Sequence, residues 1–170
     1  MRLLPLVSLQ ALIPTSPYLS LADNPTSRMP HVLRNFPDLT YQGYDAASSV
    51  IERIQADKNV TDLGPRVSFA TADLAVTSLP TGKDLIFSRD ALQHLAMPLI
   101  LSVLRTFQAA GPAWLMVGSY PRRWSNILIE TGGYFPINLA APPFLLMPSH
   151  IHSEGPNVAI DPNNLDHKHM

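Results

Sequence analysis

The stretch of sequence that most constrains the fold is residues 84–95, Asp-Leu-Ile-Phe-Ser-Arg-Asp-Ala-Leu-Gln-His-Leu. Residues 85–87 form an unbroken apolar run, which is typical of a strand covered on both faces of a sheet. A polar cluster at residues 88–90 follows at once, and apolar residues then recur at helical spacing. The pattern predicts a buried strand that stops at a polar cluster, where a helix begins. In open α/β sheets, ligands bind beyond the carboxyl ends of the strands, so this edge is the first candidate site.

Predicted strands and helices alternate along the rest of the chain. Residues 39–45 and 66–73 are rich in β-forming residues and each stretch ends on an acid, while residues 113–118 are apolar throughout. A helix of about three turns is predicted from residue 48. Another is predicted from Pro98 to Gly111, because proline suits the first helical turn and glycine the residue after the last. This order predicts an α/β fold, with a Rossmann-like, mostly parallel sheet flanked by helices in three layers.

Both ends of the chain are rich in proline, with 17 prolines in the sequence against eight glycines. Residues 1–30 lack periodicity and are predicted to be an irregular segment with one candidate strand at 18–22. Residues 31–147 are predicted to be the α/β domain, which begins with the end of a helix and includes a polar connection at residues 59–65. Residues 148–170 are predicted to be an extended tail with little regular structure.

The composition excludes several classes of protein. The net charge of −1 gives no field that would gather nucleic acid, and the absence of cysteine excludes disulfide scaffolds, thiolate metal sites and cysteine nucleophiles. No apolar stretch reaches the length of a membrane span. Residues 1–13 have a basic start and an apolar middle, as a signal peptide does, but Pro5 and Gln10 interrupt the run. We therefore expect a soluble, cytoplasmic protein, with secretion as the alternative.

Several motifs resemble those of a class I S-adenosylmethionine-dependent methyltransferase domain. Gly43-Tyr-Asp45 ends one predicted strand, Asp73 follows the next, and the run of residues 84–95 is the third motif. That run also resembles a subgroup with an Arg-Asp-x-Leu-x-His-Leu signature and a downstream Gly-Gly…Asn-Leu…Pro-Pro-Phe segment. The matching downstream residues are Asn126, Gly132-Gly-Tyr-Phe-Pro-Ile-Asn-Leu139 and Pro142-Pro-Phe144. The resemblance runs from about His31 to the end of the chain, which is most of the sequence.

The resemblance implies an enzyme that binds S-adenosylmethionine through residues at the strand ends. Asp45 would accept hydrogen bonds from the ribose hydroxyls of the cofactor, as an acid does in other dinucleotide-type sheets. Asp73, with Leu74, would flank the adenine. Ser88 and Arg89 would line the methionine end of the cofactor.

The resemblance also implies methyl transfer to an oxygen or nitrogen of a small-molecule or otherwise unidentified acceptor. Asp90 would lie at the mouth for this acceptor. Methyl transfer can run on proximity and in-line alignment alone. Where a general base is used, His94 or Asp90 is the better choice.

The chain departs from the family pattern at both ends. The family's first strand ends in a glycine-rich turn that lets the backbone pass close to the cofactor, but no glycine precedes Gly43 here. In the corresponding stretch, residues 20–29, Asp23 and Asn24 stand where glycine is expected. The family also has further sheet strands, which would begin near Lys168 and continue beyond the sequence. Two alternatives therefore stay open: an inactive methyltransferase-like interaction or structural module, and a fragment that folds poorly alone.

Each motif residue also has a simpler interpretation. Acids at strand ends often cap the next helix, and Asp45 and Asp73 suit that role. Arg89 and Asp90 suit an ordinary ion pair at a helix start. His94, between apolar residues on the predicted helix, suits a packed and hydrogen-bonded side chain.

The tryptophans and the remaining histidines are assigned by the same reasoning. Trp114 is predicted to lie in the core, and Trp124 to be either a surface anchor or part of a lid over substrate. The pairs His150/His152 and His167/His169 have the imidazoles that zinc or nickel prefers. A His-x-His pair converges only in a strand, however, and these pairs lie in polar segments with proline. A solvated tail is preferred, and no metal site is expected.

Overall fold

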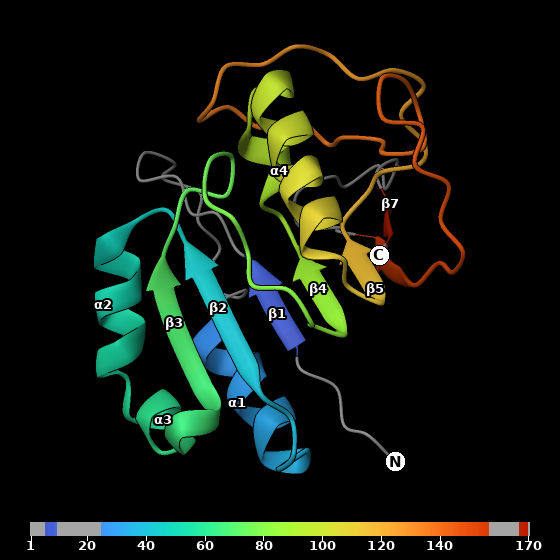
Figure 1. Cartoon of the computed structure of the whole chain (residues 1–170). Coiled ribbons are helices and arrows are strands. Elements are labelled where there is room, and N and C mark those ends of the chain that lie inside the picture. Colours follow the sequence, from blue (N-terminus) through green and yellow to red (C-terminus); the bar gives the residue numbers. More distant parts are fainter. Residues whose placement is uncertain (1–5, 10–24, 157–166, 170) are drawn as a thin grey trace.

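A computed structural model of the chain describes residues 6–9, 25–156 and 167–169 (Figure 1). Five parallel strands form one sheet in the order β3-β2-β1-β4-β5. These strands are β1 (Leu6–Leu9), β2 (Tyr41–Asp45), β3 (Val67–Thr71), β4 (Leu85–Ser88) and β5 (Trp114–Val117). The α-helices are α1 (Pro25–Asn35), α2 (Ser48–Ala56), α3 (Lys58–Thr61) and α4 (Met97–Ala110). The predicted α/β fold with a parallel sheet is confirmed.

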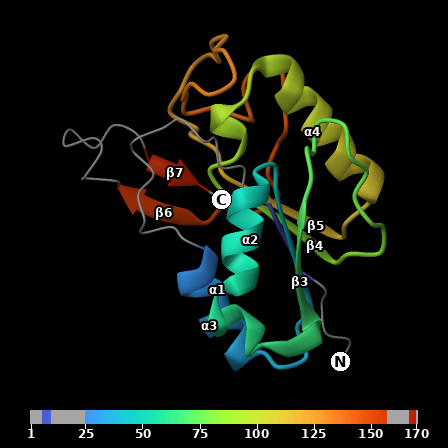
Figure 2. The same cartoon turned by 90° about the vertical axis from the view of Figure 1, so that its left-hand side faces the viewer.

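The core lies in two clusters on opposite faces of the sheet. Side chains alternate between the two faces of a strand, so Tyr41 and Tyr44, three residues apart in β2, point in opposite directions. Tyr44 packs with the buried residues of α4, which include Phe107, and with Ile86 of β4. Tyr41 packs with Leu33 of α1. Figure 2 shows α4 on one side of the sheet, with α1, α2 and α3 on the other.

Helix α4 begins and ends where the sequence predicts. Pro98 occupies its first turn, where the missing N–H has no helical acceptor to lose. Gly111 follows the last helical residue with φ +61°, in the left-handed region that glycine enters without strain. None of the helices in the described ranges is long and apolar enough to cross a membrane.

The structure corrects the predictions for both ends of the chain. Leu6–Leu9 lies in the segment predicted to be irregular, yet it forms the central strand of the sheet. The candidate strand at residues 18–22 falls outside the described residues. The C-terminal tail is not wholly irregular either, because β6 (Ser153–Pro156) and β7 (His167–His169) pair antiparallel in a separate two-stranded sheet. Lys168 therefore belongs to this small sheet and not to the five-stranded one.

Two shorter segments also differ from prediction. The polar connection at residues 59–65 contains most of helix α3 and most of the 3₁₀ helix η2 (Gly64–Arg66). The helix expected directly after the polar cluster is a single 3₁₀ turn, η3 (Leu92–His94), and α4 starts only at Met97. Leu95, between them, is extended and breaks the helical path.

Strand β5 is an edge strand and is not covered as its apolar sequence predicts. Its one strand neighbour among the described residues is β4. Trp114 is 53% exposed, so its predicted place in the core is wrong. Its ring instead meets the ring of His150, with centroids 5.7 Å apart. An apolar run shows that both faces of a strand carry apolar side chains. It does not show whether the strand lies in the middle or at the edge of the sheet.

Gly43 in β2 is required by packing rather than by backbone conformation. A Cβ added at this position would lie 2.5 Å from Cδ1 of Phe69 in the neighbouring strand β3. The Phe69 ring in turn packs against Tyr41 with a centroid distance of 5.5 Å. The glycine of the Gly43-Tyr-Asp45 motif therefore makes room for an aromatic ring.

Gly43→Ala is expected to lower the free energy of unfolding by about 2 kcal/mol, because overpacking a filled core forces ring and backbone to shift. Urea denaturation of the purified variant measures this loss. Gly43→Ala combined with Phe69→Leu is expected to cost less than the sum of the two single changes, since the smaller side chain vacates the space. Strict additivity of the two changes would contradict this account.

Candidate active site

The five parallel strands end at one edge of the sheet, and this edge collects the residues singled out in the sequence. Leu9 of β1 is paired with Tyr44 on one side and with Ser88 on the other. Beyond the strands, the Ala72 N–H donates to the Asp45 carbonyl at 2.9 Å, and the Gly118 N–H donates to the Ser88 carbonyl at 3.0 Å. The first bond ties the end of β3 to that of β2, and the second ties the end of β5 to that of β4.

Asp45 and Asp73 each begin a similar turn at this edge of the sheet, but they differ in burial. Asp45 is only 4% exposed, and its Oδ1 accepts a hydrogen bond from the Ala47 N–H at 2.8 Å, just before α2. Asp73 is exposed, and its Oδ1 accepts from the Ala75 N–H at 2.9 Å. The simpler interpretation, that these acids shape the next turn, is therefore part of their role. A carboxylate has about four acceptor positions, so shaping a turn and binding a ligand are compatible roles for such a side chain.

Ser88 ends β4 with a buried hydroxyl. The residue is 1% exposed, and among the described residues its Oγ has no hydrogen-bond partner. Leaving a buried polar group unsatisfied costs about 1–3 kcal/mol. Ser88 lies at the strand edge where α/β sheets bind ligands. A ligand bound there could supply the missing hydrogen bond, so the unsatisfied hydroxyl makes Ser88 a candidate binding residue.

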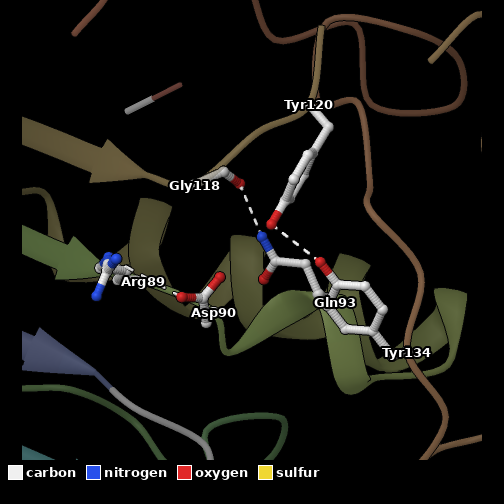
Figure 3. Close-up of polar contacts among 6 residues, drawn as sticks. All are labelled: Arg89, Asp90, Gln93, Gly118, Tyr120 and Tyr134. Carbon is white, nitrogen blue, oxygen red and sulfur yellow. Dashed lines mark hydrogen bonds and ion pairs between the residues drawn. The ribbon is translucent and has the colours of Figure 1, made fainter. Parts of the chain in front are cut away.

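Arg89 and Asp90 form a loose pair at the polar cluster. The Arg89 Nε lies 3.9 Å from Asp90 Oδ2, and both side chains are partly exposed (Figure 3). Asp90 has φ +56°, a left-handed backbone conformation that is uncommon for any residue other than glycine. Backbone strain of this kind clusters at functional sites, where the surrounding structure holds the residue in place.

The 3₁₀ turn η3 joins this cluster to the downstream segment. Gln93 is fully buried, and its Nε2 donates to the Gly118 carbonyl at 3.3 Å. The main-chain carbonyl of Gln93 accepts a hydrogen bond from the Phe135 N–H at 2.9 Å. The hydroxyls of Tyr120 and Tyr134 lie 2.9 Å from each other in the same region (Figure 3). These contacts fix η3 against the strand edge and the segment after β5.

His94 has a defined orientation and a defined tautomer. Its Nδ1 lies 2.9 Å from the Gly133 carbonyl oxygen, and a carbonyl only accepts, so Nδ1 carries the proton. In the neutral ring the lone pair is therefore on Nε2. The ring also meets Tyr134 at a centroid distance of 5.3 Å. A half-buried imidazole with its basic nitrogen fixed by the opposite hydrogen bond can accept a proton from a bound hydroxyl.

Two asparagines of the downstream motif hold together backbone that has no helix or strand. Asn126 Nδ2 donates to the carbonyls of Asn138 and Pro142, at 2.8 and 2.9 Å, and its Oδ1 accepts from the Asn138 N–H at 2.8 Å. Asn138 Nδ2 donates to the carbonyls of Arg123, at 2.7 Å, and Pro121, at 3.4 Å. The sequence gives no hint of this role except that both asparagines sit in the motif that resembles a methyltransferase subgroup.

Some candidate residues are not brought to the site. Within residues 6–9, 25–156 and 167–169, no three His, Asp or Glu side chains are grouped to hold a metal ion. The His150 Nδ1 lies 3.1 Å from the Ser149 hydroxyl, and its ring contacts Trp114. Trp124 is 96% exposed and so is not part of any core.

Comparison with known proteins supports the fold. No family model and no curated protein matches the sequence. Among solved structures, a putative O-methyltransferase from Nostoc punctiforme PCC 73102 superposes with a TM-score of 0.60 at 14% identity, covering 98% of this chain and 50% of that one. The methyltransferase domain of bacterial CtHen1 gives a TM-score of 0.57 at 12% identity, covering 97% of this chain and 87% of that one. The chain shares the fold of these two proteins.

A third similar structure was solved with a ligand. PigF with SAH gives a TM-score of 0.51 at 16% identity, covering 69% of this chain and 32% of PigF. The chain thus spans about a third of the length of PigF and half that of the Nostoc protein. At these identities the likeness shows the fold alone.

Asn138→Asp is expected to loosen the segment 121–126, because a carboxylate cannot donate to the carbonyls of Pro121 and Arg123. Losing such buried hydrogen bonds costs about 1–3 kcal/mol locally, so trypsin should cleave after Arg122 or Arg123 about tenfold faster. Digestion followed by mass spectrometry measures this rate. Asn59→Asp is the matched control, since the Asn59 side-chain oxygen accepts from Arg34 and an aspartate keeps that bond. Equal cleavage rates in the two variants would contradict the role given to Asn138.

Proposed function

We propose that this chain is an S-adenosylmethionine-dependent methyltransferase domain, Rossmann-like and three-layered, that methylates an oxygen or nitrogen of a small acceptor molecule. The observation that carries the proposal is the buried Asp45 carboxylate at the end of β2, next to the Asp73 turn and two strands from the Ser88 hydroxyl. These groups share the carboxyl edge of a methyltransferase fold. The similar structures named as O-methyltransferases favour oxygen as the acceptor atom.

The residues at this edge fit the parts of the cofactor. Asp45, held by the Ala47 N–H, supplies a fixed carboxylate for a pair of ribose hydroxyls. Asp73 and the half-buried Leu74, which packs against the core, place one polar and one apolar side chain next to each other for the adenine ring. The unsatisfied Ser88 hydroxyl would gain a hydrogen bond from the polar methionine end, which Arg89 also borders.

The chemistry divides between the cofactor and the chain. The cofactor supplies a methyl group on a positively charged sulfur, which is a good leaving group. The chain excludes water and orients the acceptor, and His94 Nε2 takes the proton that the acceptor hydroxyl loses as its oxygen is methylated. Asp90, held in a left-handed conformation at the end of β4, would orient the acceptor at the mouth of the site.

A second function of a different class is favoured by one feature of the sequence. No glycine precedes Gly43, so the glycine-rich turn expected after the first strand is missing. A methyltransferase fold without that turn could act as an inactive interaction or structural module. The two functions differ in whether the edge residues bind the cofactor.

S-adenosylhomocysteine, the product form of the cofactor, is expected to bind in a saturable manner when measured by isothermal titration calorimetry. Asp45→Ala should weaken this binding about 10- to 100-fold, since hydrogen bonds to a charged group contribute about 1.5–3 kcal/mol. Asp57→Ala is the matched control: its Oδ1 makes the same kind of turn, accepting from the Asn59 N–H at 2.8 Å, but beside α3. His94→Gln should leave the affinity within about twofold, because its role is toward the acceptor.

The absence of binding would decide between the two functions. If folded wild-type protein gives no heat at millimolar S-adenosylhomocysteine, the enzyme proposal fails and the inactive module remains. Equal weakening by Asp45→Ala and Asp57→Ala would show that Asp45 acts only through the stability of its turn.

Ser88→Ala is expected to have opposite effects on stability and binding. The free protein should be equally stable or more stable by about 1 kcal/mol, because an unsatisfied buried hydroxyl is removed. Affinity for S-adenosylhomocysteine should fall about two- to tenfold, the value of one neutral hydrogen bond. Ser102→Ala is the control, since its Oγ already donates to the Ala75 carbonyl at 2.6 Å: it should lose stability and keep its affinity. A loss of stability in Ser88→Ala would show that its hydroxyl has a partner in the free protein.

A further inference from the structure

Strand β5 leaves one edge of the five-stranded sheet open (Figure 1). The N–H groups of Trp114 and Gly118 both donate toward β4, at 2.8 and 3.0 Å. The backbone groups of successive residues in a strand point to opposite sides, so the N–H and C=O groups of Leu115 and Val117 face outward. Among the described residues, these four groups have no hydrogen-bond partner. A row of such groups is a template for pairing with another strand.

The opposite edge of the sheet, β3, is already occupied in part. The Ala72 N–H donates toward β2, so by the same alternation the Phe69 carbonyl points outward. Gln55 of α2 donates its Nε2 to that carbonyl at 3.0 Å. A strand that approached β3 would have to displace this side chain. Of the two edges of the five-stranded sheet, β5 is therefore the open one, and two copies that join their sheets do so through β5.

The sequence of β5 suits pairing with itself. When two copies are placed antiparallel about a twofold axis beside Met116, Leu115 of one copy lies opposite Val117 of the other. Each such pair exchanges two hydrogen bonds, so all the outward groups of both residues are satisfied in both copies. Trp114 falls opposite Gly118, which has no side chain to clash with the indole. A charged residue would lie close to its own copy across this axis, but residues 113–117 include none.

Apolar side chains on and beside β5 are exposed to water. Trp114, Leu115 and Met116 are 53%, 40% and 38% exposed. The ring contact between Trp114 and His150 brings the end of a second apolar segment next to the strand. Residues 144–152 contain no Asp, Glu, Lys or Arg, and their exposed large apolar side chains are Leu145, Leu146, Met147 and Ile151. Edge strands that stay unpaired are usually blunted by Lys, Pro or a bulge, and β5 has none of these.

We propose that β5 binds β5 of a second copy of this chain, so that five strands from each copy form one continuous sheet. Both copies use the same edge, so the assembly closes at a dimer. The joined sheet stays within the size that open sheets reach, about ten strands. Because the two copies run antiparallel, their candidate sites lie at opposite sides of the joined sheet. The proposal does not depend on the methyltransferase function.

Sedimentation velocity of the full chain, at concentrations up to about 100 µM, tests the proposal. The wild type is expected to form a reversible dimer and no larger species. Met116→Lys should weaken dimerisation at least about tenfold, because the two lysines lie opposite each other across the twofold axis. Val76→Lys is the matched control. Val76 is apolar and 82% exposed but lies outside β5, so this variant should dimerise like the wild type.

Leu115→Pro tests the backbone hydrogen bonds themselves. Proline removes an N–H that faces outward, and an edge strand tolerates proline at such a position. The variant is expected to keep the circular dichroism spectrum of the wild type and to be monomeric. Met116→Pro is the control, since it removes an N–H that faces β4 and should lower the stability of the monomer. Should Leu115→Pro fail to fold, Met116→Lys decides alone.

Amide hydrogen exchange locates the contact. In the wild type, exchange at Leu115 and Val117 should slow as protein concentration rises, and in Met116→Lys it should not. A wild-type chain that stays monomeric overturns the proposal, and slow exchange at both amides in that monomer would show that another part of the same chain covers β5. A dimer that persists unchanged in Met116→Lys and Leu115→Pro uses a different surface and also overturns it. So does open-ended association, because a twofold pairing of edges closes at two copies.

Discussion

The pairing of β1 with both β2 and β4 is the interaction on which the candidate site depends. In the five-stranded sheet, β1 alone connects the β3-β2 half to the β4-β5 half. Neighbouring strands lie about 4.8 Å apart, so the ends of β2 and β4 on either side of Leu9 are held about 10 Å apart. Asp45 and Ser88 act on one ligand only if this spacing is kept. The four residues of β1 thus set the distance between the two halves of the candidate site.

Three consecutive residues at the end of β2 show how closely packing and function are combined. Gly43 makes room for the ring of Phe69, and Tyr44 packs on the other face of the sheet in the core beneath α4. Burial raises the pKa of the Tyr44 hydroxyl, so the phenol stays neutral. Asp45, the last of the three, is the residue of this motif that we propose to bind the cofactor. Packing alone therefore accounts for two of the three residues of this motif.

The sequence predicted the parts of the fold that depend on local signals. Pro98 and Gly111 define α4, and the acids at the ends of two strands were expected at one edge because parallel strands end together. Strand β1 was missed because Pro5 and Gln10 flank four residues whose strand is stabilised by two neighbours far away in sequence. The exposure of Trp114 was missed for the same reason, since edge position depends on the order of strands. Within the site, the partners of the asparagines are backbone carbonyls 12 to 17 residues away, which no local pattern specifies.

The segment after β5 shows why such contacts matter for a site. From Gly118 to Phe144 the backbone forms no helix or extended strand, yet buried polar groups must still be satisfied. Side chains do this work: Gln93 binds the Gly118 carbonyl, His94 binds that of Gly133, and Asn138 binds that of Arg123. The bond to the Gly133 carbonyl also fixes the tautomer of His94. Because Gly118 is also bonded to the end of β4, this irregular segment is held to the strand edge. Because the segment is held to the strand edge and itself holds His94, the His94 ring keeps a constant distance from that edge, as the proposed alignment of acceptor and cofactor requires.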